Sequence, residues 1–197
     1  MKITTFIVDS FVTATPFSGN PAGVCFLTSP IPKPLMQSIA SELNLSETAF
    51  VLKQGDVYRI QFFTPTMEIP LCGHATLASA YCLWEQKIEQ KSAAIYFQGN
   101  SDLLIITNQE DKIKMTFPLI PMTKAQPDSQ VLSALNVSTC DAYLKGEAGV
   151  IVVLSSDHGV INAKPNQSHL EICAPTIVIL TALSSNPTFD ITSRVFA

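Results

Sequence analysis

Residues Phe62–Ala80 read FFTPTMEIPLCGHATLASA, an aromatic run and a proline-containing turn followed by a nearly uncharged segment. This segment predicts a helix from about Gly73 to Gln86. Its apolar residues lie on all sides of the helix and leave no polar stripe. These residues are Ala75, Leu77, Ala78, Tyr81, Cys82 and Trp84. A helix that is apolar on all sides is buried in a core. We therefore expect this helix to be the most buried element of the first half of the chain.

The first turn of this helix carries polar chemistry. Cys72 and His74 flank Gly73, where the free backbone N–H groups of a helix start point outward. Such an end binds anions and lowers the pKa of a nearby thiol. A buried helix whose N-terminus is open to a ligand is typical of an active site.

Strand patterns surround this helix. Runs rich in β-branched and aromatic residues predict strands at 3–9, 24–27, 47–52 and 57–63 before it, and at 94–98, 103–107 and 112–117 after it. Residues 34–43 carry apolar side chains on one helical face. Pro118 and Pro121 follow the last of these strands, so the first half is predicted to span residues 1–117.

Residues 118–197 read as a second, weaker copy of the same order. Helices are predicted at 129–135 and 167–173, and strands at 142–144, 149–154 and 176–180. The end of the chain, residues 190–197, resembles residues 58–65, the strand that leads into the buried helix of the first half. If the halves are repeats, the second half is truncated before its own central helix.

A missing central helix would leave an apolar groove in the second half. We expect its inward-facing residues to include Val150, Val152, Ile177, Ile179 and Val195. An open groove of this kind does not persist in a monomer of low charge. Either residues beyond 197 fill the groove in the natural protein, or these 197 residues alone are expected to self-associate, most simply as a homodimer, or to be loosened from about residue 118 onward.

Composition narrows the classes of partner. Of 197 residues, 47% are hydrophobic and 14% are charged, and 12 Lys+Arg against 16 Asp+Glu give a net charge of -4. Without a basic patch, nucleic acid and anionic membranes are poor partners. Five cysteines without metal or disulfide spacing indicate free thiols in a reducing cytosol. We find no signal peptide, membrane span, phosphate loop or zinc-ligand cluster, and so expect a cytoplasmic protein without a metal site.

Three side chains are candidates for chemistry, each with an alternative. Glu47 leads into an apolar strand, where lost hydration suits a general acid or base, although a carboxylate at a strand start can also be a rim residue or a cap. His74 could orient a substrate or share a proton, or simply bond a carbonyl at the helix start. Cys72 could be a thiolate base, but a buried cysteine is more often a small hydrophobic residue.

Several motifs, taken in order, resemble those of the phenazine-biosynthesis PhzF-like proteins. They are Val8-Asp9-Ser10-Phe11, Gly19-Asn20-Pro21-Ala22, Leu43-Asn44-Leu45-Ser46-Glu47-Thr48-Ala49-Phe50, Phe63-Thr64-Pro65, Cys72-Gly73-His74-Ala75-Thr76 and, at the end, Ser193-Arg194-Val195-Phe196-Ala197. The resemblance implies an α+β, diaminopimelate-epimerase-like fold, with two pseudo-symmetric halves that each wrap a barrel-like sheet around a central helix.

The same resemblance implies a cofactor-independent isomerase that moves a proton between carbons of a small, possibly cyclic, carboxylic acid in a cleft between the halves. It assigns the general acid/base to Glu47 and substrate binding to Asn20, Gly73 and His74. In the related amino-acid epimerases a cysteine occupies about the place of Cys72, so a Cys72-dependent racemase or epimerase is the alternative. The family's later Glu-Asp-Pro-x-Thr-Gly-Ser-Ala segment has no counterpart in these residues. An inactive remnant that acts only by association is therefore a third reading.

Overall fold

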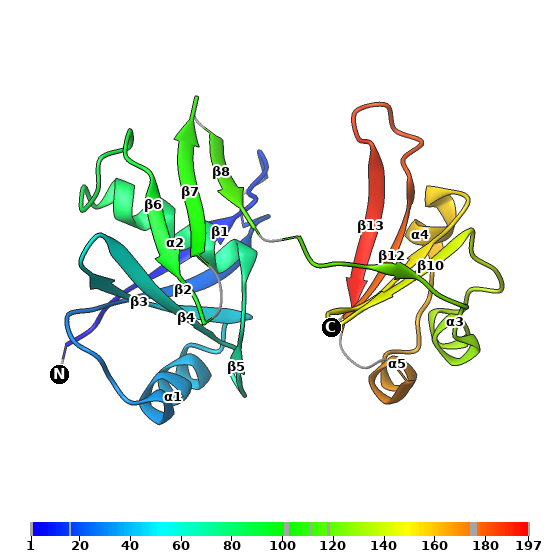
Figure 1. Cartoon of the computed structure of the whole chain (residues 1–197), viewed down its shortest axis with the longest axis horizontal. Helices are drawn as coiled ribbons and strands as arrows, with labels where there is room; N and C mark the ends of the chain where they lie inside the picture. Colours follow the sequence, from blue (N-terminus) through cyan, green and yellow to red (C-terminus); the bar gives the residue numbers. More distant parts are fainter. Residues whose placement is uncertain are drawn as a thin grey trace. The chain divides into compact units, whose positions relative to one another are not determined.

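The computed structural model of the chain describes residues 2–15, 17–100, 103–110, 112–117, 119–173 and 177–196 (Figure 1). The chain forms two compact units, residues 1–118 and 119–197, and each combines one sheet with helices. The expected α+β class is confirmed. None of the helices in the described ranges is long and apolar enough to cross a membrane.

The first unit is built on a sheet with the order β1-β2-β3-β4-β6-β7-β8, and a short β5 pairs with β4. Its strands are β1 (Thr4–Ser10), β2 (Asn20–Leu27), β3 (Glu47–Gln54), β4 (Val57–Phe63), β5 (Glu68–Ile69), β6 (Ile95–Gln98), β7 (Leu103–Gln109) and β8 (Lys112–Thr116). The pairs β2–β3 and β4–β6 are parallel, and the other pairs are antiparallel. The sequence patterns predict every strand here except the two-residue β5.

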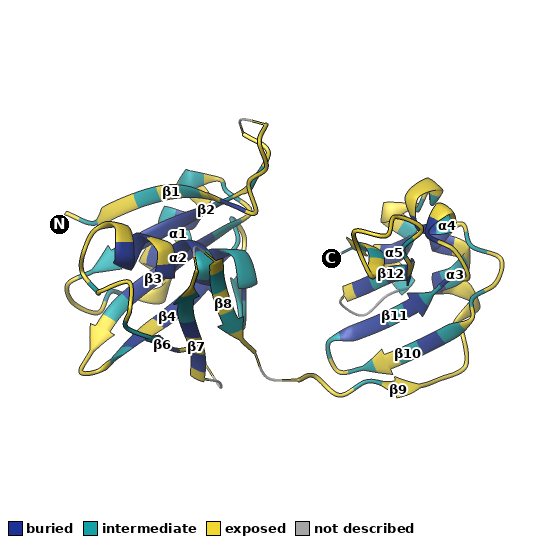
Figure 2. Cartoon of the chain, turned by 90° about the horizontal axis from the view of Figure 1, so that it is seen from above, coloured by how far each residue is buried: buried dark blue, intermediate teal, exposed yellow. Residues whose placement is uncertain are grey.

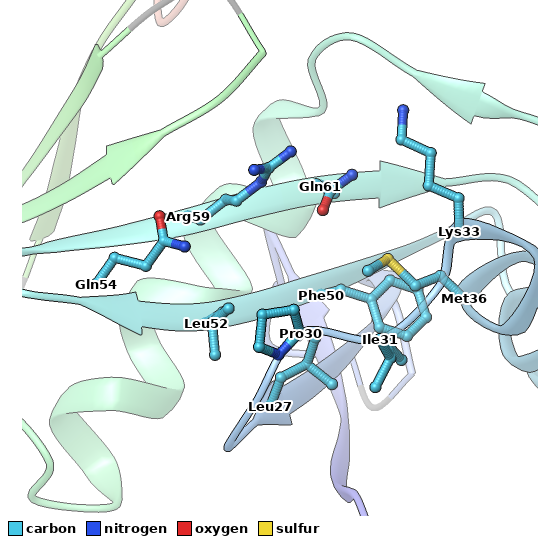
Figure 3. A pocket seen from close by; sticks show the side chains of 10 residues that line it. All are labelled: Leu27, Pro30, Ile31, Lys33, Met36, Phe50, Leu52, Gln54, Arg59 and Gln61. Carbon is cyan, nitrogen blue, oxygen red and sulfur yellow. The ribbon is translucent and has the colours of Figure 1, made fainter.

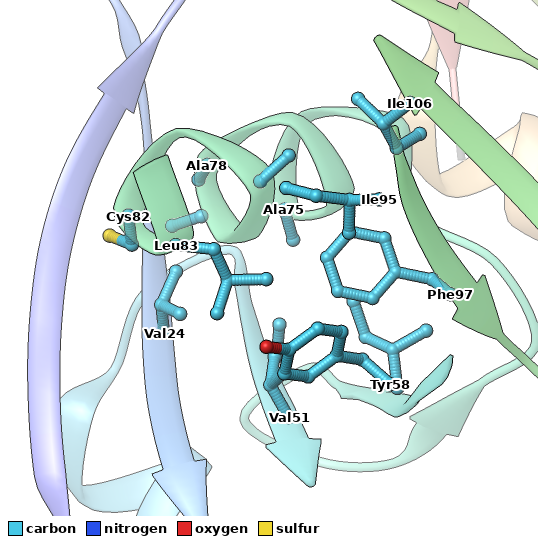
Figure 4. Packing of buried hydrophobic residues seen from close by; sticks show 14 of the residues in the cluster. Val24, Val51, Tyr58, Ala75, Ala78, Cys82, Leu83, Ile95, Phe97 and Ile106 are labelled. Atoms are coloured by element: carbon cyan, nitrogen blue, oxygen red, sulfur yellow. The ribbon is translucent and has the colours of Figure 1, made fainter. Parts of the chain in front are cut away.

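Helix α2 (Gly73–Glu85) lies in the core that this sheet encloses (Figure 4). Its buried residues are Ala75, Thr76, Ala78, Ser79, Ala80, Cys82, Leu83 and Trp84. The hydroxyls of Thr76 and Ser79 can be buried because they donate to the helix carbonyls of Cys72 and Ala75. The predicted central helix is confirmed, but Tyr81 is 45% exposed, so one side of the helix reaches solvent.

The opposite face of the same sheet is covered by α1 (Lys33–Leu43). Side chains alternate along a strand, so Phe50 of β3 packs toward Met36 of α1, whereas its neighbour Val51 packs into the α2 core. Because helices cover both faces, residues 49–52 of β3 form a continuous apolar run, as is typical of strands buried on two sides.

The second unit has a sheet with the order β13-β12-β11-β10-β9. Its strands are β9 (Thr123–Lys124), β10 (Ala142–Gly146), β11 (Gly149–Val153), β12 (Ile177–Leu183) and β13 (Ile191–Phe196), and its helices are α3 (Ser129–Leu135), α4 (Asp157–Asn162) and α5 (Gln167–Cys173). Figure 2 shows that buried positions gather on the central strands and on one side of the helices. The sequence patterns predict neither α4 nor β9, and Thr176, the predicted start of a strand, lies outside the described residues.

The two units repeat one strand pattern, as the sequence predicts. In the first, β1–β2 is antiparallel, β2–β3 is parallel with α1 between the strands, and β3–β4 is antiparallel. In the second, β10–β11 is antiparallel, β11–β12 is parallel with α4 and α5 between the strands, and β12–β13 is antiparallel. The last strand, β13, therefore corresponds to β4, which precedes α2 in the first unit.

The list of groove-facing residues predicted for the second half is wrong in part. Val150 and Val152 are buried in the core that the sheet forms with α3, α4 and α5. Ile177 and Val195 lie on the other face, where they are 37% and 62% exposed, and Ile179 beside them is half-buried. Side chains alternate between the two faces of the sheet, and Val150 pairs with Val178, not with Ile177 or Ile179. The prediction therefore combined residues from opposite faces.

We expect the face of this sheet opposite α3, α4 and α5 to form the interface of a homodimer. It carries Ile151, Ile177, Ile179 and Val195, and none of these side chains is charged. Burying one Val or Ile side chain contributes roughly 1.5–3 kcal/mol. Light scattering after size exclusion should give twice the mass of one chain for the wild type, and Ile179→Lys should shift the protein toward monomer.

Ile172→Lys is the matched control, because Ile172 is 84% exposed on α5 and should leave the mass unchanged. A compact wild-type monomer whose second unit is as well protected from hydrogen exchange as its first would contradict both self-association and loosening.

Candidate active site

The predicted site residues meet at one edge of the first sheet. β2 and β3 run parallel and begin at this edge, with Asn20 and Glu47 as their first residues. Helix α2 begins at the same edge with Cys72 as its N-cap, followed by Gly73 and His74. Residues that are more than twenty positions apart in the chain are thus brought within reach of one another.

Cys72, His74 and Glu47 form a row. The Cys72 Sγ atom lies 3.3 Å from His74 Nδ1, and the Glu47 Oε2 atom lies 3.3 Å from His74 Nε2. The imidazole is the centre of the row, and its two nitrogens face a thiol on one side and a carboxylate on the other. Its side chain is 10% exposed and that of Glu47 is 21% exposed, so both groups are largely shielded from water but still reachable.

Two serines complete the surroundings of His74. Ser46 Oγ lies 3.4 Å from His74 Nε2 and donates to the Pro21 carbonyl at 3.3 Å and toward Asn20 Oδ1 at 3.5 Å. Ser10 Oγ donates to the backbone carbonyl of His74 at 2.9 Å. Neither serine was predicted to belong to the site. The position of Ser46 directly before Glu47 in the same motif could have indicated that it lies there.

The carboxylate of Glu47 keeps an unused lone pair. Oε2 lies within ion-pair distance of His74 Nε2, at 3.3 Å, but this buried oxygen has no hydrogen-bond partner among the described residues. A buried oxygen without a partner is costly. An unpaired carboxylate oxygen that is shielded from water can accept a proton from a bound molecule.

The start of α2 is open to an anion. No side-chain hydrogen bond of standard geometry caps it, and the protonated Cys72 thiol is only a weak acceptor near the N–H groups of His74 and Ala75. A Cβ atom added at Gly73 would only reach ordinary contact with Phe117, at 3.8 Å. Packing therefore does not require glycine at this position, but its absent side chain leaves the N–H groups accessible. Partial positive charge at a helix start favours a carboxylate.

The N–H groups at the helix start do lower the pKa of Cys72, but burial of the thiol outweighs this effect. The net pKa of this thiol is raised to about 12, chiefly by burial; the charge of Glu47 also raises it, and the N–H groups of Ala75 and His74 lower it. Desolvation is the largest of these effects because the residue is only 7% exposed. At pH 7 only about one molecule in 10⁵ then carries the thiolate that acts as a nucleophile or base.

This pKa predicts slow alkylation of Cys72. Because the pKa rises from 9.0 to about 12 on folding, the thiol stays protonated up to about pH 12, and its reaction with iodoacetamide at pH 8 should be about a thousandfold slower than in the urea-unfolded chain. Peptide mass mapping separates Cys72 from the other four cysteines. Equal rates in the folded and unfolded chains would show that folding does not raise the pKa of this thiol.

The Glu47, Cys72 and His74 side chains are also of the types that bind metal ions. Glu47, Cys72 and His74 each offer one ligand atom, and these atoms lie within 4.8 Å of one another. A zinc ion takes one nitrogen from each histidine. The three groups are therefore close enough to share one ion, although the thiol and the carboxylate each contact a different nitrogen of the ring in the structure.

The sequence of the chain is similar to those of known proteins. The family model described as phenazine biosynthesis-like protein matches residues 8–197. An uncharacterized isomerase of Pseudomonas aeruginosa is 36% identical over all 197 residues, which span 73% of that protein. Another, from Halalkalibacterium halodurans, is 34% identical over 97% of this chain and 72% of its own length.

Solved structures show the same fold. A PhzF-family protein of Enterococcus faecalis matches with a TM-score of 0.86 and 34% identity, over 99% of this chain and 73% of that one. A PhzC/PhzF protein of Clostridium difficile matches with a TM-score of 0.83 and 39% identity, over 100% of this chain and 74% of that one. The chain therefore belongs to the PhzF-like family of phenazine biosynthesis-like proteins.

Proposed function

We propose that this protein is an isomerase that moves a proton between carbon atoms of a small carboxylic acid, with Glu47 as the general acid and base. The observation that carries the proposal is the buried Glu47 Oε2 atom, which has no hydrogen-bond partner among the described residues and lies beside His74 at the open start of α2. The relatives from Pseudomonas aeruginosa and Halalkalibacterium halodurans that bear the name isomerase support the same reaction class.

In the first step the Glu47 carboxylate takes a proton from a carbon next to the conjugated system of the substrate. The electron pair of the broken C–H bond moves into that system, so negative charge builds up on the carboxyl end. In the second step the protonated Glu47 returns the proton to a different carbon. The product has the same composition as the substrate, and the chain's own carboxylate supplies both transfers.

The start of α2 would hold the carboxylate of the substrate. Free N–H groups near Gly73 and the imidazole of His74 can donate to an oxyanion, and such donors stabilise charge that develops in the transition state. Asn20, at the first position of β2, can contribute its amide at the exposed side of the site. These three residues are the proposed binding set.

A panel of small acids in D₂O tests this proposal. The chain is incubated with cyclic and open-chain unsaturated carboxylic acids and, in parallel, with L-amino acids, and ¹H NMR follows the loss of C–H signals. We expect exchange and isomerisation in the unsaturated acids, with cyclic acids first. Exchange at the α-carbon of amino acids alone would instead support a Cys72-dependent racemase or epimerase.

The thiol alternative is disfavoured by the raised pKa of Cys72. The third reading, a remnant that acts only by association, rests on the bare apolar face of the second unit. It would be supported if no acid in the panel exchanged while the chain still formed stable dimers.

A further inference from the structure

A pocket lies in the first unit, between α1 and the sheet (Figure 3). Its volume is about 180 Å³. The lining residues are Leu27, Pro30, Ile31, Lys33, Met36, Phe50, Leu52, Gln54, Arg59 and Gln61. The proposed isomerase reaction uses none of them.

The register of the sheet explains how the floor is formed. Leu27, Leu52 and Arg59 are direct neighbours across β2, β3 and β4, and Phe50 lies opposite Gln61 in the next row. These two rows face α1, because the residues between them in β3 and β4 pack into the α2 core. The pocket therefore has an apolar floor and a polar end on β4.

Charges on the rim are unequal. Lys33 pairs with the carboxylate of Glu68, and Gln61 donates to the same carboxylate at 3.2 Å. Arg59 is exposed and forms no ion pair in the part of the chain that the structure describes. The Lys33–Glu68 end is neutral as a pair, so a negative ligand would be attracted mainly at the Arg59 end. A planar guanidinium matches a carboxylate with two parallel hydrogen bonds.

We propose that this pocket binds a small free carboxylate with one apolar ring or a short branched chain, its apolar part on Leu27, Leu52 and Phe50 and its carboxylate on Arg59. The volume sets the size, since an apolar cavity of about 150 Å³ accepts one benzene ring. An apolar wall with a few polar groups that fix orientation is the usual composition of a small-molecule site.

The pocket and the Glu47 site are separate. Phe50 and Leu52 point to the α1 face of β3, and the helix start that carries His74 belongs to α2, which packs on the opposite face. Occupation of one site can therefore be measured independently of the other.

Methyl NMR of the whole chain with benzoate as the probe tests the proposal. Benzoate should shift the signals of Leu27, Leu52 and Met36, while the neutral isostere benzamide and the ring-free anion acetate should bind much more weakly. Arg59→Gln should weaken benzoate binding by about tenfold or more, as for a lost charge-assisted hydrogen bond. Lys114→Gln removes the same charge from an exposed position on β8 and should leave binding unchanged.

Glu47→Gln separates the two sites. If benzoate binds the α1 pocket, this variant should leave the shifts of Leu27 and Leu52 and their midpoint unchanged, whether or not the proposed isomerase reaction is correct. Equal binding of benzoate to Arg59→Gln and wild type would overturn the proposal. So would equal binding of benzamide and benzoate, or the absence of shifts at these methyls.

Discussion

Glu47→Gln is expected to lower kcat/KM by a factor of about 10²–10⁴, the usual contribution of one general acid or base, for whichever acid the isomerase exchanges. Glutamine has nearly the same shape but cannot accept the proton, so KM should change little. The measurement is the steady-state rate of isomerisation. Thermal unfolding should show a fold as stable as the wild type, because the lost carboxylate oxygen Oε2 has no hydrogen bond among the described residues.

Glu42→Gln is the matched control. Glu42 is exposed on α1, so this variant changes the net charge by the same amount away from the site. Its rate should equal that of the wild type. If Glu47→Gln retained the wild-type rate as well, the proton would have to be transferred by another group.

Ala78→Asp is expected to destabilise the first unit by several kcal/mol. Ala78 is 0% exposed in the middle of α2, where an aspartate would be charged, unpaired and removed from water. A typical domain is stable by only about 5–15 kcal/mol, so the variant should be largely unfolded or strongly shifted in a urea titration followed by circular dichroism.

The control for this substitution is Ala14→Asp, because Ala14 is exposed in the loop after β1. It should unfold at the same urea concentration as the wild type. An Ala78→Asp variant with near wild-type stability would mean that α2 is not the packed centre of the first unit.

Periodicity explains why most of the fold could be predicted from the sequence. The α2 pattern is apolar over more than three turns, and burial of Ala75, Ala78 and Leu83 follows from it directly. Tyr81 escaped the prediction because an all-apolar helix does not reveal which side the sheet leaves open. Short elements such as β5 and β9 have two residues each, too few for any period to appear.

The sequence predicted which residues make up the candidate site, but it did not predict the pKa of Cys72. Glu47 and His74 were selected from their places at a strand start and a helix start, and the structure brings them within 3.3 Å of each other. For Cys72 the sequence shows only the helix start, which lowers the pKa, and not the depth of burial, which raises it to about 12. Ser10 reaches His74 only through the folded sheet.

The rate of C–H to C–D exchange in D₂O, measured side by side for wild type, Glu47→Gln and Cys72→Ala with the same acid, tests the central claim most directly. We predict that Glu47→Gln loses exchange by at least about 10², whereas Cys72→Ala keeps it within about tenfold of wild type, because its thiol is protonated at neutral pH. Loss of exchange in Cys72→Ala with full exchange in Glu47→Gln would contradict the account and identify the thiol as the base.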